Sequence, residues 1–293
     1  MRLLIICAVS LLAWCQSSSL LASEIRLAVT DLVGLEELQR EFGAFVDTLE
    51  QATGHEVHFF PVSNRTAAAQ ALRFEKVDFV LTGPAEYVVL RKLTQAEPVV
   101  GFSRPDYYGI LVALSDSNMT LPSELAGKKV ALGSVGSTSK HLAPLQIMAD
   151  YGLQPLTDLE IIHTRYPVAW EAMKRGDVHA VGITHDKFEV LRSEEADKGG
   201  LPHGAFRVIG RGPDLPNDVL LVGKHVEASL VQTVKRAFVE HSDELIAAIL
   251  EGSDNQKYQG MKFIGNIQDS DYDYVRSMYV TAGYPEFAEF IGD

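Results

Sequence analysis

The stretch Lys129-Val130-Ala131-Leu132-Gly133-Ser134-Val135-Gly136-Ser137-Thr138-Ser139-Lys140 joins a short apolar strand to the start of an amphipathic helix, whose pattern runs from about Ser137 to Gly152. The first N–H groups of a helix lack partners inside the helix, and the helix dipole is positive at that end. The side chains of Ser137, Thr138 and Ser139 add hydroxyl donors. The stretch predicts an anion site at a strand-to-helix junction, with an ordinary Ser or Thr N-cap as the alternative.

Strand-like and helix-like segments alternate along the chain from residue 25 to about residue 223, and a long helical pattern covers residues 227–250. Such alternation predicts an α/β fold whose sheets are mostly parallel and flanked by helices on both faces. Ligands of these folds sit beyond the carboxyl ends of strands. The loops expected at that edge are 82–84, 133–137 and 164–167.

The N-terminal segment, residues 1–23, reads as a signal peptide: Arg2 precedes an apolar run that is short for a membrane span, followed by a serine tract. Both cysteines, Cys7 and Cys15, lie in this segment, so residues 24–293 offer no thiol chemistry. Bulky Trp14 stands where lipid attachment at Cys15 would need a small residue. We therefore expect a secreted protein that is not lipid-anchored.

The chain of 293 residues is acidic, with 26 Lys and Arg against 39 Asp and Glu and a net charge of −13. This charge disfavours binding to nucleic acids or anionic membranes. No Ser/His/Asp set or pair of carboxylates suggests catalysis, and no residue spacing predicts a metal site or a cofactor. We expect a binding protein rather than an enzyme.

Several segments together resemble the substrate-binding proteins of phosphonate, phosphite and phosphate ABC transporters. The most specific is Lys76-Val77-Asp78-Phe79-Val80-Leu81-Thr82-Gly83-Pro84-Ala85-Glu86-Tyr87, which is similar to a family segment ending in Gly-Pro-Ala-x-Tyr. Further similar segments follow in the family's order: 125–131, 136–139 with Pro144 and Gly152, 215–218 and 271–276. Each segment is weakly specific, but the ordered set covers nearly all of residues 24–293.

The resemblance implies a two-lobed type II periplasmic-binding-protein fold, with two mostly parallel sheets joined by two hinge strands. Lobe I would comprise residues 24–107 and 215–293, and lobe II residues 108–214. In such relatives the Ser-Thr-Ser helix start binds the oxyanion, which implies that role for Ser137, Thr138 and Ser139. The family tyrosine of the Gly-Pro-Ala segment corresponds to Tyr87.

Two positions depart from the family pattern. Tyr166 stands where phosphonate-binding relatives carry a histidine, and His179 stands where they carry an aspartate. Both side chains can exchange hydrogen bonds with a partly protonated anion, so we include them in the predicted site. Tyr108 is a further candidate for facing the ligand, while its neighbour Tyr107 is a weaker one.

Three arginines, Arg65, Arg104 and Arg165, fall near strand ends, where a guanidinium can clamp an oxyanion. Most such arginines are surface residues, and Arg165 is the best of the three candidates.

The sequence thus predicts a monomeric periplasmic solute-binding protein that delivers a small oxyanion to an inner-membrane ABC permease without any cofactor. A second hypothesis is a sensing module that presents its bound ion to a membrane sensor kinase.

Overall fold

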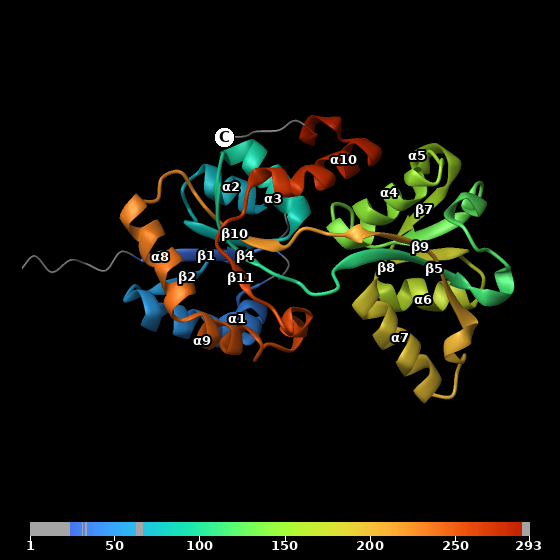
Figure 1. Cartoon of the computed structure of the whole chain (residues 1–293), viewed down its shortest axis with the longest axis horizontal. Helices are drawn as coiled ribbons and strands as arrows, with labels where there is room; N and C mark the ends of the chain where they lie inside the picture. The colour runs from blue at the N-terminus through green and yellow to red at the C-terminus, as the bar shows by residue number, and fades with distance from the viewer. Residues whose placement is uncertain (1–23, 31, 33, 63–66, 289–293) are drawn as a thin grey trace, which may run out of the picture.

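A computed structural model describes residues 24–288, except for residues 31, 33 and 63–66. The predicted signal peptide therefore lies outside the described residues. The molecule is elongated, with two α/β halves side by side (Figure 1). Among the described residues, none of the helices combines the length and apolar character needed to cross a membrane.

The first half is built on a six-stranded sheet with the order β11-β4-β10-β3-β1-β2. Its strands are β1 (Ile25–Val29), β2 (Val57–Phe59), β3 (Phe79–Thr82), β4 (Glu97–Phe102), β10 (Asp218–Val222) and β11 (Phe263–Ile264). The second half has a five-stranded sheet with the order β7-β6-β8-β5-β9. Its strands are β5 (Tyr108–Leu114), β6 (Lys129–Leu132), β7 (Glu160–His163), β8 (Ala180–Thr184) and β9 (Phe206–Asp214).

Most strands of each sheet run in the same direction, as expected, but both sheets also contain antiparallel pairs. In the first sheet β1 pairs in parallel with β2 and β3, but β10 runs antiparallel to β3 and β4. In the second, β6 is parallel to β7 and β8, whereas β5 is antiparallel to β8 and β9. The cause is the return path of the chain, since β5 and β10 are the strands by which it enters one half and comes back to the other.

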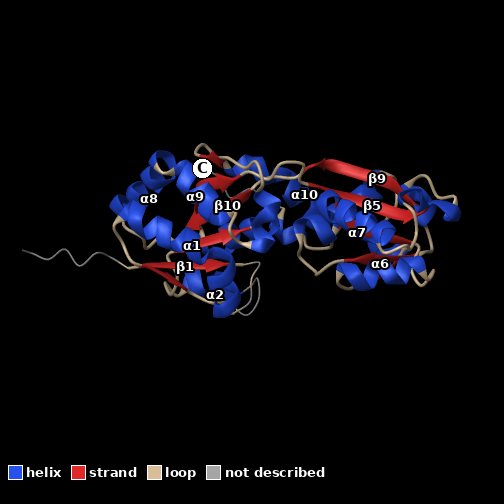
Figure 2. Ribbon diagram, turned by 90° about the horizontal axis from the view of Figure 1, so that it is seen from below, coloured by secondary structure: helices blue, strands red, loops and turns tan. Residues whose placement is uncertain are grey.

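Helices cover both faces of each sheet (Figure 2). One face of the first sheet packs on α1 (Leu35–Thr53), α8 (Ala228–Glu240) and α9 (Ser242–Ile249), and the other on α2 (Ala67–Arg73) and α3 (Pro84–Thr94). The second sheet lies between α6 (Tyr166–Lys174) with α7 (His185–Asp197) and α4 (Ala143–Asp150) with the short α5 (Pro155–Asp158).

The single long helix predicted over residues 227–250 is wrong at its centre. The structure has two helices there, and the chain breaks at His241, whose φ of −119° is not helical. The acidic residues Asp243 and Glu244 then occupy the first turn of α9. Carboxylates stabilise the first turn of a helix through its dipole. Hydrophobic periodicity does not take the position of acidic residues into account, so it missed the break.

The C-terminal helix α10 (Asp273–Thr281) contacts both halves of the molecule. It packs on α3 of the first half and on α4 of the second. The Thr281 hydroxyl donates a hydrogen bond to the side-chain carbonyl of Gln146 on α4 at 2.6 Å. As a result one apolar core, which includes Leu145 and Met278, continues from the first half into the second.

Candidate anion-binding site

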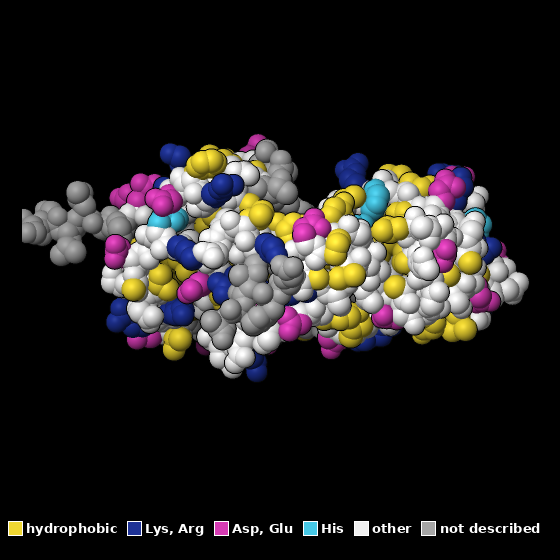
Figure 3. Space-filling view, turned by 90° about the horizontal axis from the view of Figure 1, so that it is seen from above, with side chains coloured by type: hydrophobic (Ala, Val, Ile, Leu, Met, Phe, Trp, Pro, Cys, Tyr) yellow, Lys and Arg dark blue, Asp and Glu magenta, His cyan; other side chains and the backbone are white. Residues whose placement is uncertain are grey.

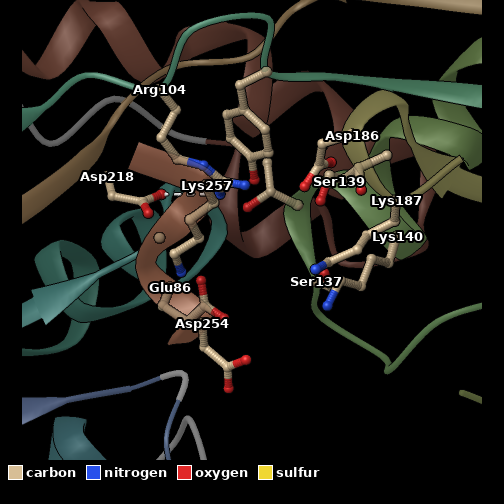
Figure 4. Close-up of a pocket in the computed structure, with 14 residues that line it drawn as sticks. Glu86, Arg104, Ser137, Ser139, Lys140, Asp186, Lys187, Asp218, Asp254 and Lys257 are labelled. Carbon is tan, nitrogen blue, oxygen red and sulfur yellow. Dashed lines mark ion pairs between the residues drawn. The ribbon is translucent and has the colours of Figure 1, made fainter. Parts of the chain in front are cut away.

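A small pocket of about 90 Å³ lies where the two halves of the molecule meet. Figure 4 shows Arg104, Asp218 and Lys257 on one side of it and Ser137, Ser139 and Asp186 on the other. Its lining comes from both halves and consists of Gly83, Glu86, Arg104, Tyr107, Ser137, Thr138, Ser139, Lys140, Thr184, Asp186, Lys187, Asp218, Asp254 and Lys257. The predicted serine–threonine cluster is thus in contact with a cavity.

Three helix starts converge on this pocket. Gly83 is the N-cap residue of α3, Ser137 that of the helical segment leading into α4, and Thr184 that of α7. All three line the pocket, and none of them caps its own helix through a side-chain hydrogen bond. The positive ends of the three helix dipoles therefore meet at one small volume, and the helix starts after Ser137 and Thr184 also have free N–H groups there, which favours a negatively charged ligand.

The loop before Ser137 is fixed by two histidines. The buried ring of His141 accepts a hydrogen bond at Nδ1 from the N–H of Gly136 at 3.1 Å, and Nδ1 of His163 lies 2.7 Å from the carbonyl oxygen of Gly133. The two rings meet edge to face, 4.9 Å apart. Burial, with a smaller contribution from His163, lowers the pKa of His141 to about 4, so its ring is neutral and can accept this bond at physiological pH.

Helix geometry at Ser137 is also unusual. Residues Thr138–Leu142 form a π-helical turn, and the carbonyl of Ser137 accepts bonds from the N–H groups of both His141 and Leu142. π-Helical turns occur often at functional sites. Ser137, Thr138 and Ser139 are 3–4% exposed, so their hydroxyl groups are shielded from bulk solvent on the pocket wall.

Side chains of both charges line the pocket. The basic side chains are Arg104, Lys140, Lys187 and Lys257, and the acidic ones are Glu86, Asp186, Asp218 and Asp254. The Arg104 guanidinium lies 3.6 Å from Asp218 and 3.6 Å above the centre of the Tyr107 ring. Asp218 also accepts a hydrogen bond of 2.5 Å from the Tyr258 hydroxyl. The site therefore contains cations and fixed acceptors as well as the neutral donors expected from the sequence.

Tyr87 and His179 are not brought to the pocket. Tyr87 is fully buried and donates its hydroxyl hydrogen to Asp269 at 2.6 Å, in contact with the Tyr272 ring. Burial, and then the bond to Asp269, raise its pKa, so it stays a neutral donor. His179 is exposed just before β8, at the end of this strand opposite to Thr184, and its Nδ1 accepts the N–H of Lys129 at 3.3 Å.

Tyr108 and Tyr166 lie near the pocket but do not line it. The Tyr108 ring stacks on His185, and the Arg211 guanidinium lies 3.7 Å from the centre of the ring. Because neighbouring side chains of an extended chain point in opposite directions, Tyr107 faces the pocket instead. The Tyr166 ring faces the Lys140 ammonium at 5.0 Å, and its pKa is raised by burial and further by the charge of Asp186.

Of the three arginines considered, Arg104 lines the pocket, Arg165 is exposed outside it, and Arg65 lies outside the described residues. The loop of residues 164–167 follows β7, which is an edge strand, whereas the pocket uses the loop after the interior strand β8. The expectation that ligands sit beyond the carboxyl ends of strands, here called the carboxyl-end rule, identified the correct edge of the sheet. Thr184 ends a predicted strand, so that rule could have found it together with Asp186 and Lys187.

Among the residues that the structure describes, no group of three or more His, Cys, Asp or Glu side chains is arranged to hold a metal ion. On the face shown in Figure 3, acidic and basic side chains are interspersed over the surface.

Comparisons with known proteins agree with this architecture. A phosphate-import protein PhnD of Mycolicibacterium smegmatis is 24% identical over 235 residues, which cover 75% of this chain and 72% of that protein. A binding-protein component of an ABC phosphonate transporter from Pseudomonas aeruginosa has a similar structure, with a TM-score of 0.65, 18% identity, and coverage of 90% of this chain and 87% of that one. PhnD1 of Prochlorococcus marinus, solved with methylphosphonate, gives a TM-score of 0.67 at 14% identity, covering 89% of this chain and 98% of that one.

At these identities the structural likeness establishes the fold, which is that of two-lobed periplasmic binding proteins. The family itself is shown by the sequence of residues 34–272, which match the family model described as "ABC transporter, phosphonate, periplasmic substrate-binding protein". The chain therefore belongs to the family of periplasmic substrate-binding proteins of phosphonate ABC transporters.

Proposed function

We propose that this protein captures a small oxyanion in the periplasm and delivers it to an inner-membrane ABC permease. The observation that carries the proposal is the meeting of three helix starts and the Ser137–Ser139 hydroxyl groups around one small pocket. Their donors suit oxygen atoms that share a negative charge. Binding of this kind needs no cofactor, and we propose no catalytic step.

We infer further that the ligand carries a hydrogen as well as anionic oxygens. Glu86 and Asp186 stand in the first turns of α3 and α7, so their carboxylates offset the positive ends of these helices. A fully deprotonated anion would be repelled by them, whereas a ligand with an acidic O–H can donate to one of them. Phosphate keeps such a hydrogen near neutral pH, and phosphite and alkylphosphonates keep it in a fraction of their molecules, whereas sulfate does not.

We propose that residues 24–107 with 215–293 form lobe I, that residues 108–214 form lobe II, and that the lobes close on the ligand. The chain crosses between the sheets at residues 103–107 and 215–217, and the two crossings are tied by the bond from the N–H of Leu215 to the carbonyl of Tyr107 at 2.8 Å. Arg104 and Tyr107 lie on a crossing and line the pocket, so a hinge motion would move them relative to the ligand. We also propose that residues 1–23 act as a signal peptide for export of the protein, and that the protein is a monomer.

A thermal-shift screen tests this function. The panel comprises phosphate, phosphite, methylphosphonate, arsenate, sulfate and nitrate, each at millimolar concentration and neutral pH. A ligand at 100 times its Kd stabilises the folded protein by about 2.7 kcal/mol, which raises Tm by several degrees. We expect a rise with at least one of the protonated oxyanions and a smaller one with sulfate or nitrate, and a flat response to the whole panel would refute the oxyanion assignment.

Transport and sensing are separated by uptake of the ligand that the screen identifies. Cells lacking this protein should lose high-affinity uptake of that ligand, and restoring the gene should recover it. Normal uptake, together with loss of a transcriptional response to the same ligand, would instead favour the sensor-kinase hypothesis.

A further inference from the structure

The helix α3 begins without a cap of its own. Its N-cap residue is Gly83, which has no side chain to accept the free N–H groups of the first turn. A side-chain acceptor at this position stabilises a helix. Pro84 removes one of the free donors, and Ala85 is the next residue that must find an acceptor.

The acceptor comes from the other half of the molecule. The N–H of Ala85 donates to Oγ1 of Thr138 at 2.9 Å, and both residues are buried. Ala85 is the second residue of α3, which is one of the two positions that an N-cap side chain serves in ordinary helices. The carbonyl of Ala85 accepts the Tyr279 hydroxyl of α10 at 3.0 Å, so both backbone polar groups of Ala85 have partners outside α3.

Thr138 also lines the pocket. A hydroxyl group can accept one hydrogen bond and donate another at the same time. Since its oxygen is used by Ala85, the hydroxyl hydrogen remains the group that can be offered to a ligand oxygen. Hydrogen bonds in such a chain polarise and strengthen one another, so an anion that accepts from Thr138 makes its oxygen a better acceptor for Ala85.

We propose that Thr138 caps helix α3 across the cleft, and that this bond couples ligand binding to closure of the two lobes. Separation of the lobes would break the cap and leave the N–H of Ala85 to solvent. Binding would favour the capped, closed form because the ligand interacts with Thr138 more strongly there than in the open form. The ligand part of this inference rests on the proposed function, whereas the cap itself does not.

The test measures hydrogen exchange of the Ala85 amide by NMR in four proteins: wild type, Thr138→Ser, Thr138→Val and Ser137→Ala. Thr138→Ser keeps the cap oxygen, and Thr138→Val removes it with little change in shape. Ser137→Ala is the matched control, because it deletes a neighbouring pocket hydroxyl that makes no bond to α3. Thermal unfolding identifies any variant that fails to fold, and in that case Thr138→Ala replaces Thr138→Val.

Without ligand, we expect the Ala85 amide to exchange at least 10-fold faster in Thr138→Val than in wild type, Thr138→Ser or Ser137→Ala. With saturating methylphosphonate, or inorganic phosphate if only that binds, exchange should slow further in wild type and Thr138→Ser. Equal exchange in wild type and Thr138→Val would overturn the cap. An amide that exchanges alike with and without bound ligand would overturn the coupling. If no probe binds the wild type, the proposed function fails, while the ligand-free comparison still decides whether the cap exists.

Discussion

At the level of the single residue, Ser137 has a backbone role and a separate side-chain role. Its carbonyl closes the π-helical turn, and its hydroxyl lies on the pocket wall. We predict that Ser137→Ala weakens oxyanion binding by about 1.5–3 kcal/mol, the usual range for a hydrogen bond to a charged group, because the backbone turn survives and only the donor is lost. Isothermal titration calorimetry with the tightest ligand of the panel measures this change.

Ser134 provides the control for this prediction. It belongs to the same loop but is exposed and does not line the pocket. Ser134→Ala should bind like wild type. Equal affinities of all three proteins would remove Ser137 from the site.

His141 should make the stability of the protein depend on pH. Its folded pKa of about 4 lies below its ordinary value of 6.5, so between these values the unfolded chain takes up a proton that the folded protein refuses. The free energy of unfolding should therefore fall as the pH decreases from about 6.5 to 4, by about 3 kcal/mol from this group. Urea unfolding at pH 7, 5.5 and 4 follows the loss.

His141→Asn isolates that contribution. An asparagine oxygen can still accept the N–H of Gly136 but does not titrate. The variant should lose less stability than wild type over the same pH range, whatever its stability at pH 7. Parallel pH profiles of the two proteins would contradict the assignment.

At the level of elements, the pocket depends on how closely α4 approaches the second sheet. Gly182 on β8 permits this contact, because a Cβ at this position would lie 2.6 Å from a methyl group of Leu132 and 2.7 Å from Pro144 of α4. Gly109 on β5 similarly leaves only 3.2 Å between such a Cβ and the carbonyl oxygen of Ser139. The small residues of these two strands thus determine how closely the helix start can approach the second sheet.

We predict that Gly182→Ala destabilises the protein by about 1–3 kcal/mol, the range for overpacking a core, and also weakens ligand binding, because Pro144 must move and carries the helix start with it. Gly204→Ala is the control, since a Cβ there would meet nothing within 4 Å. Urea unfolding and calorimetry on both variants provide the measurement. Wild-type affinity in a destabilised Gly182→Ala protein would show that the position of α4 does not control the site.

Local patterns predicted most elements of the structure because strands and helices leave periodic signals. The strand Lys129–Leu132 and the helix start at Ser137 are where the sequence predicted them. Such patterns do not predict the order of the strands in a sheet. The loop after β7 was expected at the site because nothing in the sequence reveals that β7 is an edge strand.

At the level of the whole molecule, the pocket could be predicted only in part. The serine–threonine cluster is contiguous in sequence and was found. Arg104 was one of three candidate arginines, whereas Asp218 and Lys257 come from distant segments that only the folded chain brings together. The resemblance suggested Tyr87, but side-chain direction decides whether a residue faces a ligand. The hydroxyl of Tyr87 points to Asp269, and its neighbour Glu86 lines the pocket.

The position of α10 constrains how the cleft can open. This helix is bonded to α4 through Thr281 and to the first turn of α3 through Tyr279, whereas the pocket is also bordered by the start of α7 and by Lys257. With α10 and the two chain crossings all spanning the halves, separation meets least resistance at the edge farthest from these ties. The two halves should then separate by rotation about an axis along α10. The solute should enter from the side of α7 and Lys257.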